Sequence, residues 1–219
     1  MNKFIFFIVC CFSVGINAQD IHTFFSKTNT CFETHVLNGK VAYTSILDNP
    51  ESLDDILALA KDIKVSKSDP NTYQAFWINA YNLATIKGII SNYPINSPLD
   101  NLGFFDKTTY NLGGRSITLN DIENKLLRAN FKDPRFHFVL VCGAVGCPPL
   151  ISEAYMPNTL NEQLETQTIK AINGNFIKVN SKKRRVEGSE ILKWYKEDFV
   201  LNGNEIEFLN IYRTEKEDI

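Results

Sequence analysis

Residues 74–90 read QAFWINAYNLATIKGII, and this segment is apolar on almost every side. Asp69-Pro70 stands shortly before it, and a capping side chain followed by proline is typical of a helix start. Tyr93-Pro94 follows it, so a helix is predicted from about residue 69 to residue 92. Because a helix that is apolar all round is buried on all sides, we predict that this helix lies in the core.

Three polar side chains interrupt the apolar helix. Asn79, Asn82 and Thr85 are spaced by three and therefore form one narrow stripe. Buried amides need hydrogen-bond partners. The stripe is thus either a hydrogen-bond ladder that ties the helix to a loop, or a row of side chains that faces a pocket and contacts a substrate.

Helices and hairpins alternate along the rest of the chain. Apolar spacing and turn residues predict the following elements: a helix over 50–63, a hairpin around Gly113-Gly114, a helix from Asn120 to residue 131, a buried strand over 136–142, a helix over 158–172, a hairpin over 176–188 and a helix capped by Ser189. Residues 19–45 are weakly patterned and stay unassigned. The predicted fold class is α+β: a single mixed domain over residues 19–219, with helices packed on a mostly antiparallel sheet with β-hairpins.

The first 18 residues, MNKFIFFIVCCFSVGINA, have the pattern of a secretory signal peptide. Lys3 precedes an apolar run, and Asn17-Ala18 resembles a small-residue cleavage site before Gln19. The run is too short for a membrane span. Val9 stands before Cys10, where a lipid-modified cysteine would follow a small residue, so we expect a soluble exported product, periplasmic or secreted.

Charge and hydropathy exclude two classes of partner. The formal net charge is −2, and cleavage of residues 1–18 would make it one unit more negative, so no basic excess exists to bind nucleic acid. Residues 182–185, KKRR, lie between two predicted strands and are interpreted as a charged hairpin turn. No second long apolar run follows the first, so no transmembrane segment is expected in the mature chain.

Residues 137–150 read HFVLVCGAVGCPPL and gather three residues with reactive side chains. In a regular strand, His137 and Cys142 would lie roughly 16 Å apart, at about 3.3 Å per residue, and would point to opposite faces. The two therefore cannot form a local Cys–His pair in a regular strand. Gly143 and Gly146 allow a sharp turn after Cys142, which can bring Cys142 and Cys147 together.

The chemistry of this cysteine pair stays open. In an exported protein the pair can form a structural disulfide. It can equally be a reactive thiol or a redox pair at the end of a strand. A zinc site is the weakest interpretation, because C-x4-C lacks a second ligand pair of familiar spacing, and only Cys31, His22, His35 and His137 remain to complete it. No metal and no cofactor is predicted.

Four blocks of the sequence resemble the domain of unknown function 547 family. They are AFWINAYNLATIKGI, YNLGGRSITLNDIENKLLR, DPRFHFVLVCGAVGCPPL and ILKWYKEDF, and together they span about residues 70–200. The resemblance implies no particular activity. It places emphasis on the following residues: Asn79, Tyr81, Asn82, Glu123, Arg128, His137, Cys142, Gly146, Cys147 and Pro148. One departure is Ala144-Val145, which stands where many relatives have a serine and a polar or basic residue.

Two functions from different classes follow. The first is a thiol-dependent enzyme, a hydrolase, acyltransferase or redox protein, in which Cys142, Cys147 and His137 are catalytic. Its substrate, a small molecule or a peptide, would contact these four residues: Asn79, Asn82, Glu123 and Arg128. The second is a non-catalytic exported binding or scaffold domain. In that case the cysteine pair is a staple and Arg128 pairs with Glu123 or Glu153.

Overall fold

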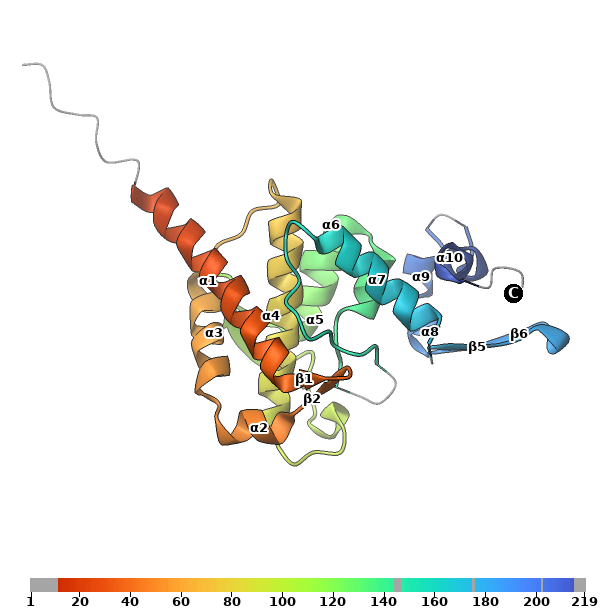
Figure 1. Cartoon of the computed structure of the whole chain (residues 1–219), viewed down its shortest axis with the longest axis horizontal. Coiled ribbons are helices and arrows are strands. Elements are labelled where there is room, and N and C mark those ends of the chain that lie inside the picture. The colour runs from red at the N-terminus through yellow and green to blue at the C-terminus, as the bar shows by residue number, and fades with distance from the viewer. Residues whose placement is uncertain (1–11, 144–146, 175, 202, 215–219) are drawn as a thin grey trace, which may run out of the picture.

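The structure, a computed structural model, describes residues 12–143, 147–174, 176–201 and 203–214 (Figure 1). Helix α4 (Pro70–Ser91) lies in the middle of the larger, N-terminal part of the fold. Nearly all side chains from its second turn onward are buried. The Asp69 carboxylate accepts a hydrogen bond from the Thr72 amide and caps the helix. The predicted central helix is therefore confirmed.

The N-terminal elements cover one side of α4. They are α1 (Phe12–His35), β1 (Val36–Leu37), β2 (Lys40–Val41), α2 (Tyr43–Asp48) and α3 (Glu51–Asp62). Phe24 and Phe32 of α1 are fully buried, and the Phe24 ring lies 5.0 Å from the Phe76 ring of α4. The unassigned segment 19–45 thus begins as a helix, because its aromatic residues recur at a spacing that faces the core.

The hairpin predicted at Gly113-Gly114 is formed by β3 (Thr109–Leu112) and β4 (Arg115–Thr118). Gly113 has a positive φ of 63°, and a Cβ there would lie 2.5 Å from Cη2 of Trp77. The position therefore requires glycine for both conformation and space. The amides of the two glycines donate to carbonyls at the end of α3, which satisfies that helix terminus.

A helical segment follows the hairpin and changes its winding. It consists of α5 (Leu119–Asp121), a π-helical stretch η2 (Ile122–Arg128) and α6 (Ala129–Phe131), and a short turn, η1 (Pro98–Asp100), precedes the hairpin. The predicted cap Asn120 is wrong. Thr118 caps the segment instead, because its hydroxyl accepts from the Asp121 amide at 3.1 Å.

The predicted strand over 136–142 is also wrong. The Asp133 side chain caps a short 3₁₀ helix, η3 (Pro134–Phe138). Val139 and Leu140 then form a turn and a bend, and residues 141–142 have no regular secondary structure. The run is apolar because both sides are buried: Phe136 belongs to the core around α4, and Phe138 belongs to a second core. Apolar burial on two sides does not by itself distinguish a strand from other buried segments.

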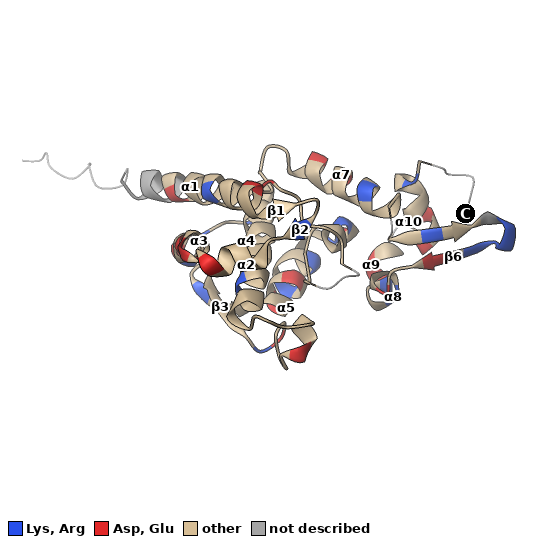
Figure 2. Ribbon diagram, turned by 60° about the horizontal axis from the view of Figure 1, so that its bottom comes forward, with Lys and Arg blue, Asp and Glu red and all other residues tan. Residues whose placement is uncertain are grey.

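The C-terminal elements form a smaller unit beside the main core. They are α7 (Leu160–Ile172), β5 (Ile177–Asn180), η4 (Ser181–Lys183), β6 (Arg185–Gly188), α8 (Ile191–Trp194), α9 (Lys196–Phe199) and α10 (Glu205–Tyr212). Their core contains Phe138, Phe199 and Phe208, whose rings contact one another. Figure 2 shows the basic residues predicted to form a turn at the projecting tip of the β5–β6 hairpin.

The α+β class is confirmed, but the arrangement of the strands differs from the prediction. The described strands form three separate antiparallel pairs, β1–β2, β3–β4 and β5–β6. The helices therefore pack mainly on one another and on α4, and the β5–β6 hairpin projects from this helical body (Figure 1).

Candidate functional site

His137 is buried and lies in a partly buried ionic cluster. Its Nε2 atom is 2.7 Å from Oδ2 of Asp198 in α9, and Nε of Arg128 donates to the same carboxylate oxygen at 2.5 Å. Only 2% of the His137 side chain is exposed. The Asp198 carboxylate thus links Arg128 and His137, which come from different helices.

Two more residues complete this cluster. The Glu123 carboxylate lies 3.9 Å from Nδ1 of His137, on the side opposite Asp198. The Tyr195 ring lies 4.1 Å from the His137 ring, and the Arg128 guanidinium lies 4.6 Å from the same Tyr195 ring. The His137 cluster is therefore Glu123, Arg128, His137, Tyr195 and Asp198.

The charges of the cluster are strongly coupled. Burial raises the pKa of Asp198, but hydrogen bonds from His137 and Arg128 outweigh it and lower this pKa to about 2. Burial lowers the pKa of Arg128, whereas its hydrogen bond to Asp198 raises it, with a net increase. Burial raises the pKa of Tyr195, and the nearby Glu123 carboxylate raises it further. Asp198 is ionised at neutral pH and can only accept, so the His137 Nε2–H group donates a hydrogen bond to it.

The π-helical winding of η2 explains why Glu123 and Arg128 meet. In a π-helix each amide bonds to the carbonyl five residues earlier, as the Ala129 amide does to the Asn124 carbonyl. Side chains five positions apart then lie on the same side of the helix. Arg128 also donates to the Asn124 side chain. The winding therefore positions both charged residues toward His137.

The cluster fastens the C-terminal unit to the main core. Arg128 and Glu123 come from η2, His137 comes from η3, and Tyr195 and Asp198 come from the α8–α9 region. A His–Asp pair can orient an imidazole as a general base. Here, however, both ring nitrogens face carboxylates and the ring is buried between Tyr195 and Phe199. Arg128 pairs with Asp198 and Glu197, so the predicted partner Glu153 is wrong.

The polar stripe of α4 forms two amide clamps. Asn79 donates to the Tyr155 carbonyl at 2.8 Å and accepts from the Tyr155 amide at 3.0 Å. Asn82 donates to the Val139 carbonyl and accepts from the Val141 amide, both at 3.0 Å. Both asparagines are fully buried, and Thr85 donates within its own helix. The stripe therefore ties α4 to the segments on either side of the cysteine pair.

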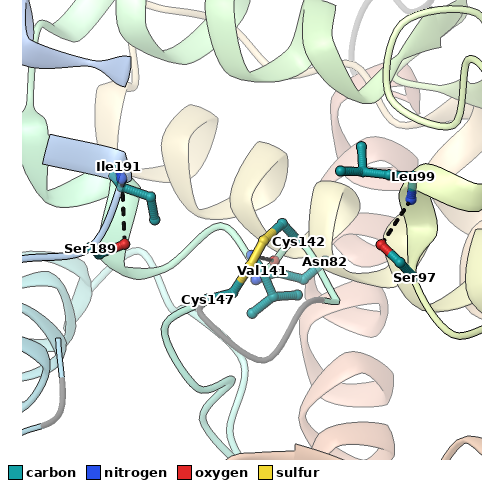
Figure 3. Close-up of a disulfide and its surroundings, with 8 residues drawn as sticks. All are labelled: Asn82, Ser97, Leu99, Val141, Cys142, Cys147, Ser189 and Ile191. Carbon is teal, nitrogen blue, oxygen red and sulfur yellow. Dashed lines mark hydrogen bonds between the residues drawn. A yellow bond between two sulfur atoms is a disulfide. The ribbon is translucent and has the colours of Figure 1, made fainter. Parts of the chain in front are cut away.

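Cys142 and Cys147 form a disulfide, with their Cα atoms 6.0 Å apart. Figure 3 shows this bond beside Val141 and Asn82, with Ser189 and Ile191 of the C-terminal unit across from it. Gly143 follows Cys142 with a φ of +70°, and a Cβ there would lie 2.5 Å from Cδ1 of Ile89. Residues Ala144, Val145 and Gly146, which the sequence analysis singled out, lie outside the described residues.

The disulfide forms one wall of a groove of about 460 Å³. The opposite wall comes from the C-terminal unit, and the lining residues are Cys142, Cys147, Phe176, Lys178, Glu187, Gly188, Ser189, Glu190, Ile191 and Trp194. This volume is typical of sites that bind small molecules or short peptide segments. We call it the disulfide groove.

Strand periodicity explains the hairpin side of the disulfide groove. Lys178 and Glu187 are directly paired across β5 and β6, so they lie on the same face. Their neighbours Val179 and Val186 point to the other face and pack on the second core. The hairpin thus buries one face and presents charged side chains to the groove on the other.

Trp194 is the largest exposed apolar side chain of the groove. It lies at the end of α8 and is 68% exposed. An indole that lines a groove and remains exposed offers both an apolar surface and a hydrogen-bond donor to a ligand. The sequence analysis did not select Trp194, because an aromatic residue in a short helix is usually part of the core.

Sequence reasoning also missed Tyr195 and Asp198. Both stand in the block WYKEDF, three positions apart, which places them on one face of a helical turn. The sequence signal that points to Asp198 is its acidic side chain, which can pair with Arg128. Of the predicted site residues, Glu123, Arg128 and His137 lie together, Cys142 and Cys147 lie in the disulfide groove, and Asn79 and Asn82 lie beneath them.

Two features are absent from the described residues, namely a group of metal-ligating side chains and a membrane-spanning helix. Within them, no three histidine, cysteine or acidic side chains are grouped so that they could hold a metal ion. No helix of the described segments is long and apolar enough to span a bilayer.

Comparison with known proteins identifies a family for part of the chain. Residues 65–170 match the model of a family described as "Protein of unknown function, DUF547". No curated protein and no solved structure matches the chain significantly. The matched segment contains α4, η2, η3, both cysteines and most of α7, whereas Tyr195, Asp198 and the hairpin wall of the disulfide groove follow it. The resemblance to the DUF547 family is therefore confirmed over residues 65–170.

Proposed function

We propose that the protein is an exported binding domain that holds a peptide in the disulfide groove. The observation that carries this proposal is the groove itself, which combines the Cys142–Cys147 bond with an exposed Trp194. A lining of apolar side chains and charges of both signs suits a short peptide with mixed side chains. A nucleic acid would require a basic surface instead.

The polar residues expected for a thiol hydrolase have other partners in this structure. A cysteine hydrolase needs a thiolate beside an imidazole base. Cys142 and Cys147 are bonded to each other, and His137 is bonded to Asp198. The two asparagines bind backbone groups. This distribution favours binding over acyl transfer as the function of the groove.

Export rests on the signal-like pattern of residues 1–18 and is supported by the disulfide, since disulfides persist mainly in oxidising compartments. Expression of the full chain in a Gram-negative host tests it. The protein recovered from the periplasm should begin at Gln19 by N-terminal sequencing. An intact chain that stays in the cytoplasm would contradict export and leave the groove unaffected.

Peptide binding is tested with a display library of linear dodecapeptides panned on the oxidised protein. Selected peptides should change the fluorescence of the exposed Trp194, whereas Trp77 is buried. The Trp194→Ala variant should lose affinity about tenfold, the size expected for one aromatic contact. Ile211→Ala, which removes another exposed apolar side chain outside the groove, should bind as the wild type does. Equal affinity in all three proteins would refute the groove as the binding site.

A further inference from the structure

We infer that the Cys142–Cys147 disulfide exchanges reversibly with the thiol of a cysteine-containing peptide held in the disulfide groove. This inference rests on the proposed peptide-binding function and adds the chemical class of the ligand. Three features of the structure carry it: access to the sulfur atoms, non-covalent support on both sides of the bond, and a cationic side chain in the same groove.

The disulfide is accessible to a ligand in the groove. Both cysteines line the groove and both are partly exposed. Cys31 offers an internal contrast, because it is 3% exposed and burial raises its pKa to about 11. Thiol chemistry requires contact with the attacking sulfur, so the pair in the groove can react where Cys31 cannot.

The chain before Cys142 is fixed without the disulfide. The Asn82 side chain holds the Val139 carbonyl and the Val141 amide, and both contacts lie in the buried core. These bonds end one residue before Cys142. Reduction of the disulfide leaves them intact, so Cys142 stays at the groove in the reduced protein.

The chain after Cys147 is fixed in the same way. Pro148 is buried, and Pro149 packs against Gly39 of the β1–β2 turn. Further along, Asn79 holds both backbone groups of Tyr155. With both flanks held by buried contacts, the two sulfur atoms remain close after reduction. A dithiol in such a site can close again without refolding, which is the structural requirement for a reversible redox pair.

Charges around the groove favour the thiolate form. Lys178 lines the groove together with the two cysteines, and a nearby cation stabilises a thiolate. The two acidic lining residues are each paired with a basic neighbour: Glu187 with Arg185 at 3.3 Å, and Glu190 with Lys193 at 3.7 Å. These pairs reduce the repulsion that a thiolate would otherwise meet.

The exchange is a two-step thiol–disulfide reaction. A peptide thiolate attacks one sulfur, the Cys142–Cys147 bond breaks, a peptide–protein disulfide forms, and the released cysteine thiolate takes a proton from water. A second thiol, from the same peptide or from another, then attacks the mixed disulfide. Two thiols are oxidised to one disulfide, and the protein disulfide is reduced to two thiols.

The test uses the full mature chain and two synthetic decapeptides. One carries a single cysteine between phenylalanine and lysine, and the other carries serine in its place. Exchange is followed by acid quenching and intact mass. The cysteine peptide and 2-mercaptoethanol are each reacted with the protein and, separately, with oxidised glutathione. The ratio of the peptide's rate to the rate of 2-mercaptoethanol should be about tenfold higher on the protein than on oxidised glutathione. One aromatic contact in the groove is worth about that factor.

Matched variants separate recognition from chemistry. Trp194→Ala should remove the tenfold preference for the peptide, whereas Ile211→Ala, outside the groove, should alter neither the rate with the peptide nor the rate with 2-mercaptoethanol. Cys142→Ser and Cys147→Ser each leave one cysteine of the pair, beside the buried Cys31, and with the peptide's mixed disulfide as reagent one of them should trap a stable adduct. If these variants fail to fold, the acid-quenched adduct on the wild type gives the same information.

Three results would overturn the inference. If the serine peptide binds with dependence on Trp194 but the cysteine peptide forms no adduct, the disulfide is a staple and the binding groove stands. If reduction abolishes the far-ultraviolet circular dichroism of the protein, the flanks do not hold without the bond. If neither peptide binds, and the cysteine peptide shows no rate preference over 2-mercaptoethanol, the proposed binding function fails together with the inference.

Discussion

The His137 cluster and the disulfide groove both contain reactive side chains, but they differ in how accessible those side chains are to a ligand. In the cluster, Asp198 pairs with both His137 and Arg128, and the His137 side chain is only 2% exposed. In the groove, Cys142 and Trp194 remain exposed to a ligand. The comparison shows that reactive side chains indicate a functional site only when a ligand can reach them, because a buried and fully paired histidine stabilises the fold instead.

The two regions are nevertheless connected. Tyr195 and Asp198 belong to the cluster, and Trp194 next to them belongs to the groove. The cluster therefore sets the position of the wall that faces the disulfide. Variants of the cluster should change stability, and variants of the groove should change ligand binding.

The largest effect is expected at Asn82, which supports the groove from below. Asn82→Leu keeps the size of the side chain but leaves the Val139 carbonyl and the Val141 amide buried without partners. At about 1–3 kcal/mol for each unpaired group, the free energy of unfolding should fall by about 4 kcal/mol. Urea denaturation measures it.

Thr85→Val is the matched control on the same polar stripe. The Thr85 hydroxyl bonds only the Tyr81 carbonyl of its own helix, so its loss should cost about 1 kcal/mol. If both variants lose the same free energy of unfolding, the hydrogen bonds from Asn82 to residues 139 and 141 add no stability beyond that of a bond within the helix.

The next effect is expected in the cluster. Asp198→Asn removes the charge that pairs with both His137 and Arg128 and should lower the free energy of unfolding by about 3 kcal/mol. Glu190→Gln, which alters an exposed carboxylate paired with Lys193, should change it by less than about 0.5 kcal/mol. A loss for Asp198→Asn as small as that of the control would contradict the role assigned to the cluster.

Acid should weaken the cluster in a defined range. The pKa of Asp198 is lowered from its ordinary value near 3.8 to about 2 in the folded protein. The stabilisation it gives is therefore complete above pH 4 and is lost as the pH falls from about 4 to about 2, with a total of about 2 kcal/mol. Unfolding curves across this range should show a smaller decline in Asp198→Asn. Parallel curves for the two proteins would exclude Asp198 as the titrating group.

Much of the helical framework could be predicted from the sequence. Helix α4 and the β3–β4 hairpin follow from local signals, namely a cap followed by proline, unbroken apolar residues and two adjacent glycines. The cysteine pair was predicted to be close, and the disulfide confirms it. Its chemical role depended on what lies across from it, and the sequence does not contain that information.

The errors lie where tertiary contacts decide the local structure. Residues 136–142 have the composition of a buried strand, yet Asn82 satisfies their backbone groups in place of a neighbouring strand. The partner of Arg128 is 70 residues away in sequence, at Asp198, so the spacing within one helix could not identify it. The disulfide groove unites residues 142 and 147 with residues 176–194, a pairing that no local pattern predicts.

The most direct measurement compares the affinity of one library-selected peptide for three proteins. These are the wild type, Trp194→Ala and His137→Gln, titrated at pH 7 and at a temperature where circular dichroism shows all three to be folded. We expect the dissociation constant to rise about tenfold in Trp194→Ala and to stay within about twofold in His137→Gln, although the latter variant should be less stable. Unchanged binding in Trp194→Ala, together with lost binding in folded His137→Gln, would contradict the assignment of the disulfide groove as the binding site and of the His137 cluster as its support.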